Sequence, residues 1–180
     1  ASRHFLRALC TIEDVSEIVA IPRRQSSVIN GSLPTALTWV EDGLGGKTAF
    51  TTALLSRLAV DREFDLIWCG HLHLVPFALL ARQFTGAPVV VHVHGIEAWT
   101  PTQKWIVNRL VTQVDAFISV SQDTKERLTN WSGLDPERGY VVPNTIDFHG
   151  LEPGPKFADL LDRYGLRGRY VLMTMGRLVG

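Results

Sequence analysis

The chain has 180 residues, of which 46% are hydrophobic and 20% charged, a composition typical of a globular protein that buries a full core. Lys and Arg together number 18, as do Asp and Glu, so the net charge gives no indication of a nucleic-acid or membrane-surface partner. No apolar run reaches the about 18 residues of a membrane helix, and the first residues do not have the pattern of a signal peptide.

Helical and strand patterns alternate along the whole chain. Apolar residues at helical spacing predict helices over residues 2–10, 47–60, 75–84, 103–113 and 157–164, and another that begins at Ser121. Short apolar runs predict strands over residues 17–21, 36–40, 65–69, 88–93, 116–120, 140–142 and 170–175. Unbroken apolar strands that alternate with helices are typical of a parallel sheet with both faces covered. The sequence therefore predicts an α/β fold, a Rossmann-like, doubly wound and mostly parallel sheet with helices on both faces.

The same pattern divides the chain into three parts. Residues 1–150 form the expected main domain, residues 151–168 hold a linker-like stretch and one helix, and residues 169–180 supply the first strand of a further domain. The chain begins within a helical pattern and stops directly after an apolar run. We therefore expect further segments beyond both ends.

The cysteines and one glycine-rich segment have structural interpretations. Cys10 and Cys69 lie in apolar runs without metal or redox spacing, so we expect buried free thiols in a reducing, cytoplasmic environment. Residues 43–48, Gly-Leu-Gly-Gly-Lys-Thr, are similar to a phosphate-binding loop, but Glu41 stands where that motif requires glycine. An exposed turn that caps the following helix is the favoured interpretation.

Polar residues follow the predicted strands, at the edge where an open α/β sheet binds its ligands. The candidate site residues, in chain order, are Gly70, His71, His73, His94, Gly95, Glu97, Trp99, Ser121, Thr124, Asn144, Gly176 and Arg177. Structural roles compete for some of them, because Ser121 is well placed to cap a helix and Asn144 to form a turn after Pro143. Four histidines at two strand ends are harder to explain by structure alone.

The segment His94–Trp99 carries the clearest chemical signal. Gly95 permits a tight turn and the close approach of a ligand. A helix after this turn would direct its N-terminal N–H groups toward an anion. Glu97 has the acceptor oxygens that sugar hydroxyls require, whereas Trp99 taken alone is better explained as a core residue.

Two His-x-His pairs leave a metal site open as an alternative. On a strand, residues i and i+2 face the same way, so His71 with His73, or His92 with His94, has the spacing to share a metal ion. Such a site would indicate a metal-dependent hydrolase. Apart from Glu97, no further ligand follows His94 closely, so the sequence favours a site without metal.

Five segments carry a resemblance that covers residues 60–180, with a loose match before them. They are Phe64–Leu74 (FDLIWCGHLHL), Pro88–Trp99 (PVVVHVHGIEAW), Val114–Ser121 (VDAFISVS) with Thr124, Val141–Asp147 (VVPNTID) and Val171–Leu178 (VLMTMGRL). Each is weak alone, but together and in this order they resemble the retaining glycosyltransferases of family 4 (glycosyl transferase group 1), which have the GT-B fold. The chain is similar to the N-terminal, acceptor-side half of such an enzyme.

This resemblance implies an enzyme that moves a sugar from a nucleotide-sugar donor to a lipid, glycan or polysaccharide acceptor with retention of configuration. His94 and the adjoining backbone would stabilise an oxocarbenium-like transition state, Glu97 would shape the cleft, and Arg177 would bind the donor diphosphate. The resemblance implies neither a metal nor another cofactor. It also implies a cytoplasmic role in cell-envelope polysaccharide synthesis, with peripheral association at the inner face of the membrane.

Some features of the family have no counterpart in the sequence. The first strand and its glycine-rich loop would precede Ala1, while the lysine that partners Arg177 and the acidic donor-binding motif would follow Gly180. We therefore expect this chain alone to be inactive without a C-terminal domain. A non-catalytic sugar- or nucleotide-binding module is the remaining alternative of another class, and a dinucleotide-dependent reductase lacks its GxGxxG signature here.

Overall fold

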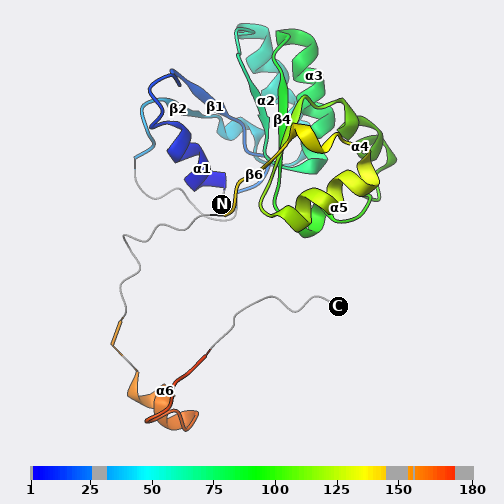
Figure 1. Ribbon diagram of the computed structural model, residues 1–180. Coiled ribbons are helices and arrows are strands. Elements are labelled where there is room, and N and C mark those ends of the chain that lie inside the picture. The colour runs from blue at the N-terminus through cyan, green and yellow to red at the C-terminus, as the bar shows by residue number, and fades with distance from the viewer. Residues whose placement is uncertain (1, 26–31, 145–153, 156, 173–180) are drawn as a thin grey trace. The chain divides into compact units, whose positions relative to one another are not determined.

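Figure 1 shows the computed structural model, which describes residues 2–25, 32–144, 154–155 and 157–172. The chain divides into two compact units, Ala1–Thr145 and Ile146–Gly180. In the second unit, helix α6 spans Ala158–Arg163, and Asp162 pairs with Arg167. Of the strand predicted over residues 170–175, residues 170–172 are exposed and not in a strand, and the rest lies outside the described residues, as do Gly176 and Arg177.

The described residues of the first unit form six parallel strands in two sheets. One sheet pairs β1 (Ile18–Ala20) with β2 (Leu37–Trp39). The other has the order β3 (Ile67–Cys69), β4 (Val89–Val93), β5 (Ala116–Ser119) and β6 (Gly139–Val141). The predicted parallel α/β fold is confirmed. The division into two sheets was not predicted, because the apolar pattern of a single strand does not reveal its neighbours.

Helices and short 3-10 turns connect these strands. The helices of the first unit are α1 (Ser2–Leu9), α2 (Lys47–Val60), α3 (Val75–Thr85), α4 (Trp105–Leu110) and α5 (Gln122–Ser132). The 3-10 turns are η1 (Glu41–Gly43), η2 (Leu72–Leu74), η3 (Ile96–Ala98), η4 (Val111–Gln113) and η5 (Pro136–Arg138). The helix expected over residues 103–113 is shorter, because its first residues belong to a loop and its last turn tightens into η4. None of the described helices has the length and apolar character to cross a membrane.

Helices cover both faces of the four-stranded sheet. On one face, the buried side chains of Val91 and Phe117 pack in a single core with those of α3 and α5. On the other face, the Phe5 ring of α1 lies 4.8 Å from the Trp68 ring and 5.3 Å from the His92 ring, centroid to centroid. Residues of β4 thus alternate between two packed layers, which is why four of its five residues are valine. Figure 1 shows α2 and α3 side by side at one end of this sheet.

Two local predictions need correction. Cys69 is buried as expected, and burial raises the pKa of its thiol to about 12, but Cys10 is only half-buried at the end of α1. Gly43 is buried rather than exposed, because its turn packs against the end of β1. A Cβ atom at Gly43 would lie 2.7 Å from Cγ2 of Ile21 and 2.8 Å from the carbonyl oxygen of Pro22.

Candidate active site at the ends of β3 and β4

The carboxyl ends of β3 and β4 bring four histidines together on neighbouring strands. His71 and His73 follow β3, and their rings stack with centroids 5.3 Å apart. His92 and His94 belong to the end of β4, and their ring centroids lie 4.3 Å apart, so this pair faces one way as the strand period requires. Nε2 of His94 lies 3.2 Å from the carbonyl oxygen of Gly70, a contact that joins the two strand ends.

The contact with Gly70 orients the ring of His94. A carbonyl oxygen only accepts hydrogen bonds, so His94 donates its Nε2 proton to Gly70. Within the described residues the other ring nitrogen of His94, the buried Nδ1, has no partner. The contact therefore holds an oriented imidazole at the end of β4.

Glu97 fixes the turn that follows β4. Its Oε1 accepts a hydrogen bond from the backbone N–H of His94, and the N–H of Ala98 donates to the carbonyl of Gly95 at 2.8 Å. The expected helix after Gly95 is wrong, because only the 3-10 turn η3 forms before the chain runs on through Pro101. The backbone N–H of His94 is therefore committed to Glu97 and is not free to contact a transition state.

His92 is a core residue rather than a ligand. It is 4% exposed and packs between Phe5 and Trp68, whose rings are centred 5.3 Å and 5.7 Å away. Burial, with a smaller contribution from His94, lowers the pKa of His92 to about 4. In the part of the chain that the structure describes, no three His, Cys, Asp or Glu side chains are placed to hold a metal ion together. The metal-dependent hydrolase therefore has no supporting geometry here.

His71 and His73 are also held by local contacts. Nδ1 of His71 accepts the backbone N–H of His73 at 3.1 Å, which caps η2, and Sγ of Cys69 donates to the carbonyl of His71 at 3.3 Å. Burial lowers the pKa of both histidines. A lowered pKa agrees with the accepting role of Nδ1 in His71, because a protonated ring could not accept there.

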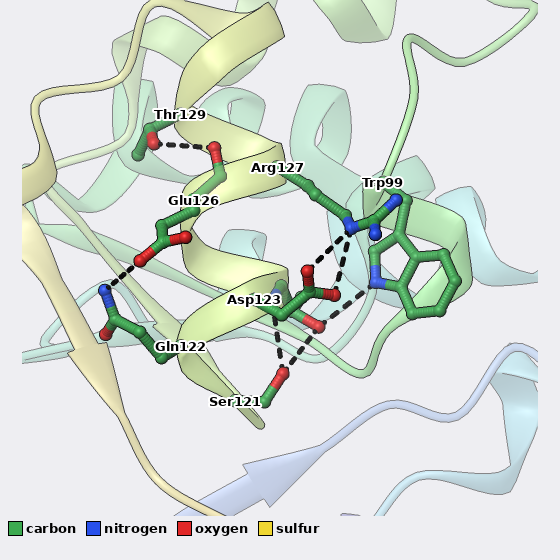
Figure 2. Close-up of polar contacts among 8 residues, drawn as sticks. Trp99, Ser121, Gln122, Asp123, Glu126, Arg127 and Thr129 are labelled. Carbon is green, nitrogen blue, oxygen red and sulfur yellow. Dashed lines mark hydrogen bonds and ion pairs between the residues drawn. The ribbon is translucent and has the colours of Figure 1, made fainter.

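Residues at the start of α5 fasten the loop that carries Glu97. Ser121 is the expected helix cap, since its Oγ accepts the backbone N–H of Thr124 at 3.1 Å. Nε1 of Trp99 donates to Oγ1 of the buried Thr124 at 3.2 Å. The guanidinium of Arg127 lies 4.7 Å from the centre of the Trp99 ring, and Figure 2 shows the two side chains beside each other. Trp99 is 36% exposed, so the expectation of a core residue is wrong.

Trp131 fastens the same loop from the far end of α5. Its Nε1 donates to the carbonyl oxygen of the fully buried Ala98 at 2.8 Å. Trp131 was not predicted, because nothing in the local sequence pattern around it points to a partner so far away in the chain. Asn144 lies exposed just after β6, at the edge of the described segment, and joins none of these contacts.

Two cavities accompany these elements. One, of about 530 Å³, lies along α2 and includes none of the predicted site residues. The other, of about 260 Å³, is lined by His73, Ile96, Glu97 and residues 100–104. The smaller cavity therefore adjoins the candidate site.

A parallel α/β unit whose ionisable residues gather at the carboxyl ends of adjacent strands belongs to the Rossmann-like class of ligand-binding folds. The family model of Glycosyltransferase Family 4 matches residues 18–149, and the chain belongs to this family. No curated protein sequence matches the chain.

Solved structures agree with this assignment at the level of the fold. Anabaena Alr3699/HepE in complex with UDP-glucose matches 64% of this chain and 33% of its own, with 18% identity and a TM-score of 0.50. The same protein in complex with UDP matches 72% of this chain and 36% of its own, with 16% identity and a TM-score of 0.52. The chain thus spans about a third of the HepE chain, and its fold is that of the N-terminal half of a GT-B glycosyltransferase.

Proposed function

We propose that the protein containing this chain is a retaining glycosyltransferase that moves a sugar from a nucleotide-sugar to a glycan or lipid acceptor. The observation that carries this proposal is the placement of His94, oriented by Gly70 and by Glu97 at the carboxyl end of a central strand. Membership of family 4 and the fold shared with a UDP-glucose complex support a nucleotide-sugar donor.

The chemistry of the transfer explains why an oriented side chain is needed at this position. During transfer the bond from C1 of the sugar to the leaving phosphate oxygen breaks, and a bond from C1 to the acceptor oxygen forms on the same face. The acceptor proton leaves with the departing diphosphate, and positive charge develops at C1. We propose His94 and Glu97 as the catalytic and cleft-shaping residues.

The remaining site residues have proposed binding roles. Gly95, His71 and His73 lie beside His94 and are proposed to contact donor or acceptor. Arg177, outside the described residues, is proposed to bind the donor diphosphate. The proposal includes no metal and no other cofactor. Because those roles require a donor-binding domain, the isolated 180-residue chain is proposed to be inactive.

Transfer should be measured with the full-length protein, a panel of nucleotide-sugars and glycan or lipid acceptors, with NMR assignment of the anomeric configuration in the product. His94→Ala should lower kcat at least about a hundredfold, a loss typical of a group that acts on the transition state. The exposed Gln83→Ala on α3 is the matched control. Unchanged turnover in His94→Ala, or binding of nucleotide-sugar without any transfer, would favour a non-catalytic binding module.

A further inference from the structure

A cavity of about 260 Å³ lies beside Glu97. It is lined by His73, Ile96, Glu97, Thr100, Pro101, Thr102, Gln103 and Lys104. This volume falls just below the roughly 300–1,000 Å³ of ordinary small-molecule sites. The cavity therefore suits one sugar- or phosphate-sized group and is too small for a whole nucleotide-sugar.

One wall of the cavity is a preorganised loop. Asn108 of α4 makes three hydrogen bonds to Thr102: Oδ1 accepts from the Thr102 N–H at 2.9 Å and from its Oγ1 at 2.8 Å, and Nδ2 donates to its carbonyl at 2.8 Å. The N–H of Lys104 donates to Oγ1 of Thr102 at 3.2 Å. A loop held in this way loses little conformational freedom when a ligand binds, which favours affinity.

The charges around the cavity favour an anion. Lys104 lines it directly, and Arg23 lies close enough that both cations lower the pKa of His73 beyond the effect of burial. Glu97 is the acidic group of the lining, and its Oε1 is occupied by the N–H of His94. A ligand that enters therefore meets two nearby cations, Lys104 and Arg23, and one carboxylate, Glu97.

The geometry points to an acceptor subsite for a phosphoryl group in this cavity, with Lys104 as its charged contact and the Thr102 loop as its wall. The inference rests on the proposed function, because Glu97 both lines the cavity and holds the His94 backbone. A phosphoryl group bound here lies next to the residues proposed for transfer. The acceptor is thus a phosphorylated glycan or a lipid with a phosphate headgroup.

The test uses the 180-residue chain and inorganic phosphate, followed by amide NMR. Phosphate should shift the signals of Thr102, Lys104 and His73, whereas chloride at equal ionic strength should not. Lys104→Gln should weaken phosphate binding about fivefold, the effect of about 1 kcal/mol from one exposed charge. Lys47→Gln, which removes the same charge from the exposed start of α2, is the control and should leave binding unchanged.

Asn108→Ala supplies a second variant that keeps every charge. It frees the loop and should also weaken phosphate binding, with the chemical shifts outside residues 100–108 unchanged. Equal losses in the Lys104 and Lys47 variants, or no shift of the cavity signals with phosphate, would overturn the subsite. These titrations use the chain without donor, so neither outcome depends on donor binding.

Two further arms identify the source of the phosphate and separate this inference from the proposed function. Tighter binding of glucose 1-phosphate than of inorganic phosphate indicates a phosphorylated glycan. Cosedimentation with phosphatidylglycerol vesicles, but not with phosphatidylcholine vesicles, indicates a lipid headgroup, provided that Lys104→Gln abolishes it. Phosphate binding without any sugar transfer by the full-length protein would remove the proposed function and leave an anion site. Transfer without phosphate binding would remove the subsite alone.

Discussion

Replacing Trp131 by Phe removes a single hydrogen bond that holds the loop after β4. The indole Nε1 donates to the carbonyl of Ala98 at 2.8 Å, and Ala98 is fully buried, so the variant leaves a carbonyl oxygen without its partner and without access to water. A buried acceptor that loses its donor costs about 1–3 kcal/mol, and the smaller ring adds lost packing. We expect the free energy of unfolding to fall by about 2–3 kcal/mol.

Urea denaturation followed by circular dichroism measures this change in the free energy of unfolding. The same substitution at two other tryptophans provides the comparison. Trp99→Phe removes a longer bond of 3.2 Å from a ring that is 36% exposed, so its cost should be about 1 kcal/mol. Trp105 is 71% exposed on α4, and Trp105→Phe should change stability by less than about 0.5 kcal/mol. If Trp131→Phe were no more harmful than Trp105→Phe, the hydrogen bond to Ala98 would not be a significant source of stability.

Three further results are expected. His92 has a pKa of about 4 in the folded chain and about 6.5 in the unfolded chain, so between these pH values only the unfolded chain binds the extra proton. The free energy of unfolding should therefore fall by up to about 3 kcal/mol as the pH drops from 6.5 to 4. His92→Leu should flatten this part of the pH profile measured by chemical denaturation. Gly139→Ala should lower the melting temperature by several degrees, because its Cβ would overlap the buried ring of Phe117. Lys104→Gln should raise the pKa of His73 in an NMR titration, because it removes a cation that disfavours the protonated ring.

Each of these expectations has a matched control. Gly70→Ala introduces the same methyl group where the nearest atoms, on Trp68, are 3.8 Å away, so it should be tolerated in the melting experiment. A pH profile that kept its slope in His92→Leu would assign the acid sensitivity to another group. A His73 titration that moved equally in Lys47→Gln would show that general charge, and not Lys104, sets its pKa.

The sequence was informative about elements and their order, and less so about contacts between them. Strand ends such as His94 could be located because an apolar run stops at a polar residue, and Ser121 could be recognised because capping is a local interaction. Glu97 was expected to face a ligand, yet its carboxylate binds a backbone N–H three residues away, a choice that depends on the conformation of Gly95. Trp131 could not be found at all, because its hydrogen bond depends on how α5 packs against the loop.

The order of the four-stranded sheet has a consequence for how the protein is made. Ile67 pairs with Val89, Val90 with Ala116, and Phe117 with Gly139, so each strand adds to the one that was synthesised before it. Among the described strands of this sheet, none pairs with a strand from much later in the chain, and the loop closures are correspondingly short. The sheet that presents His94 is therefore able to grow from one edge while the chain leaves the ribosome, with β6 as the last of the described strands to be made.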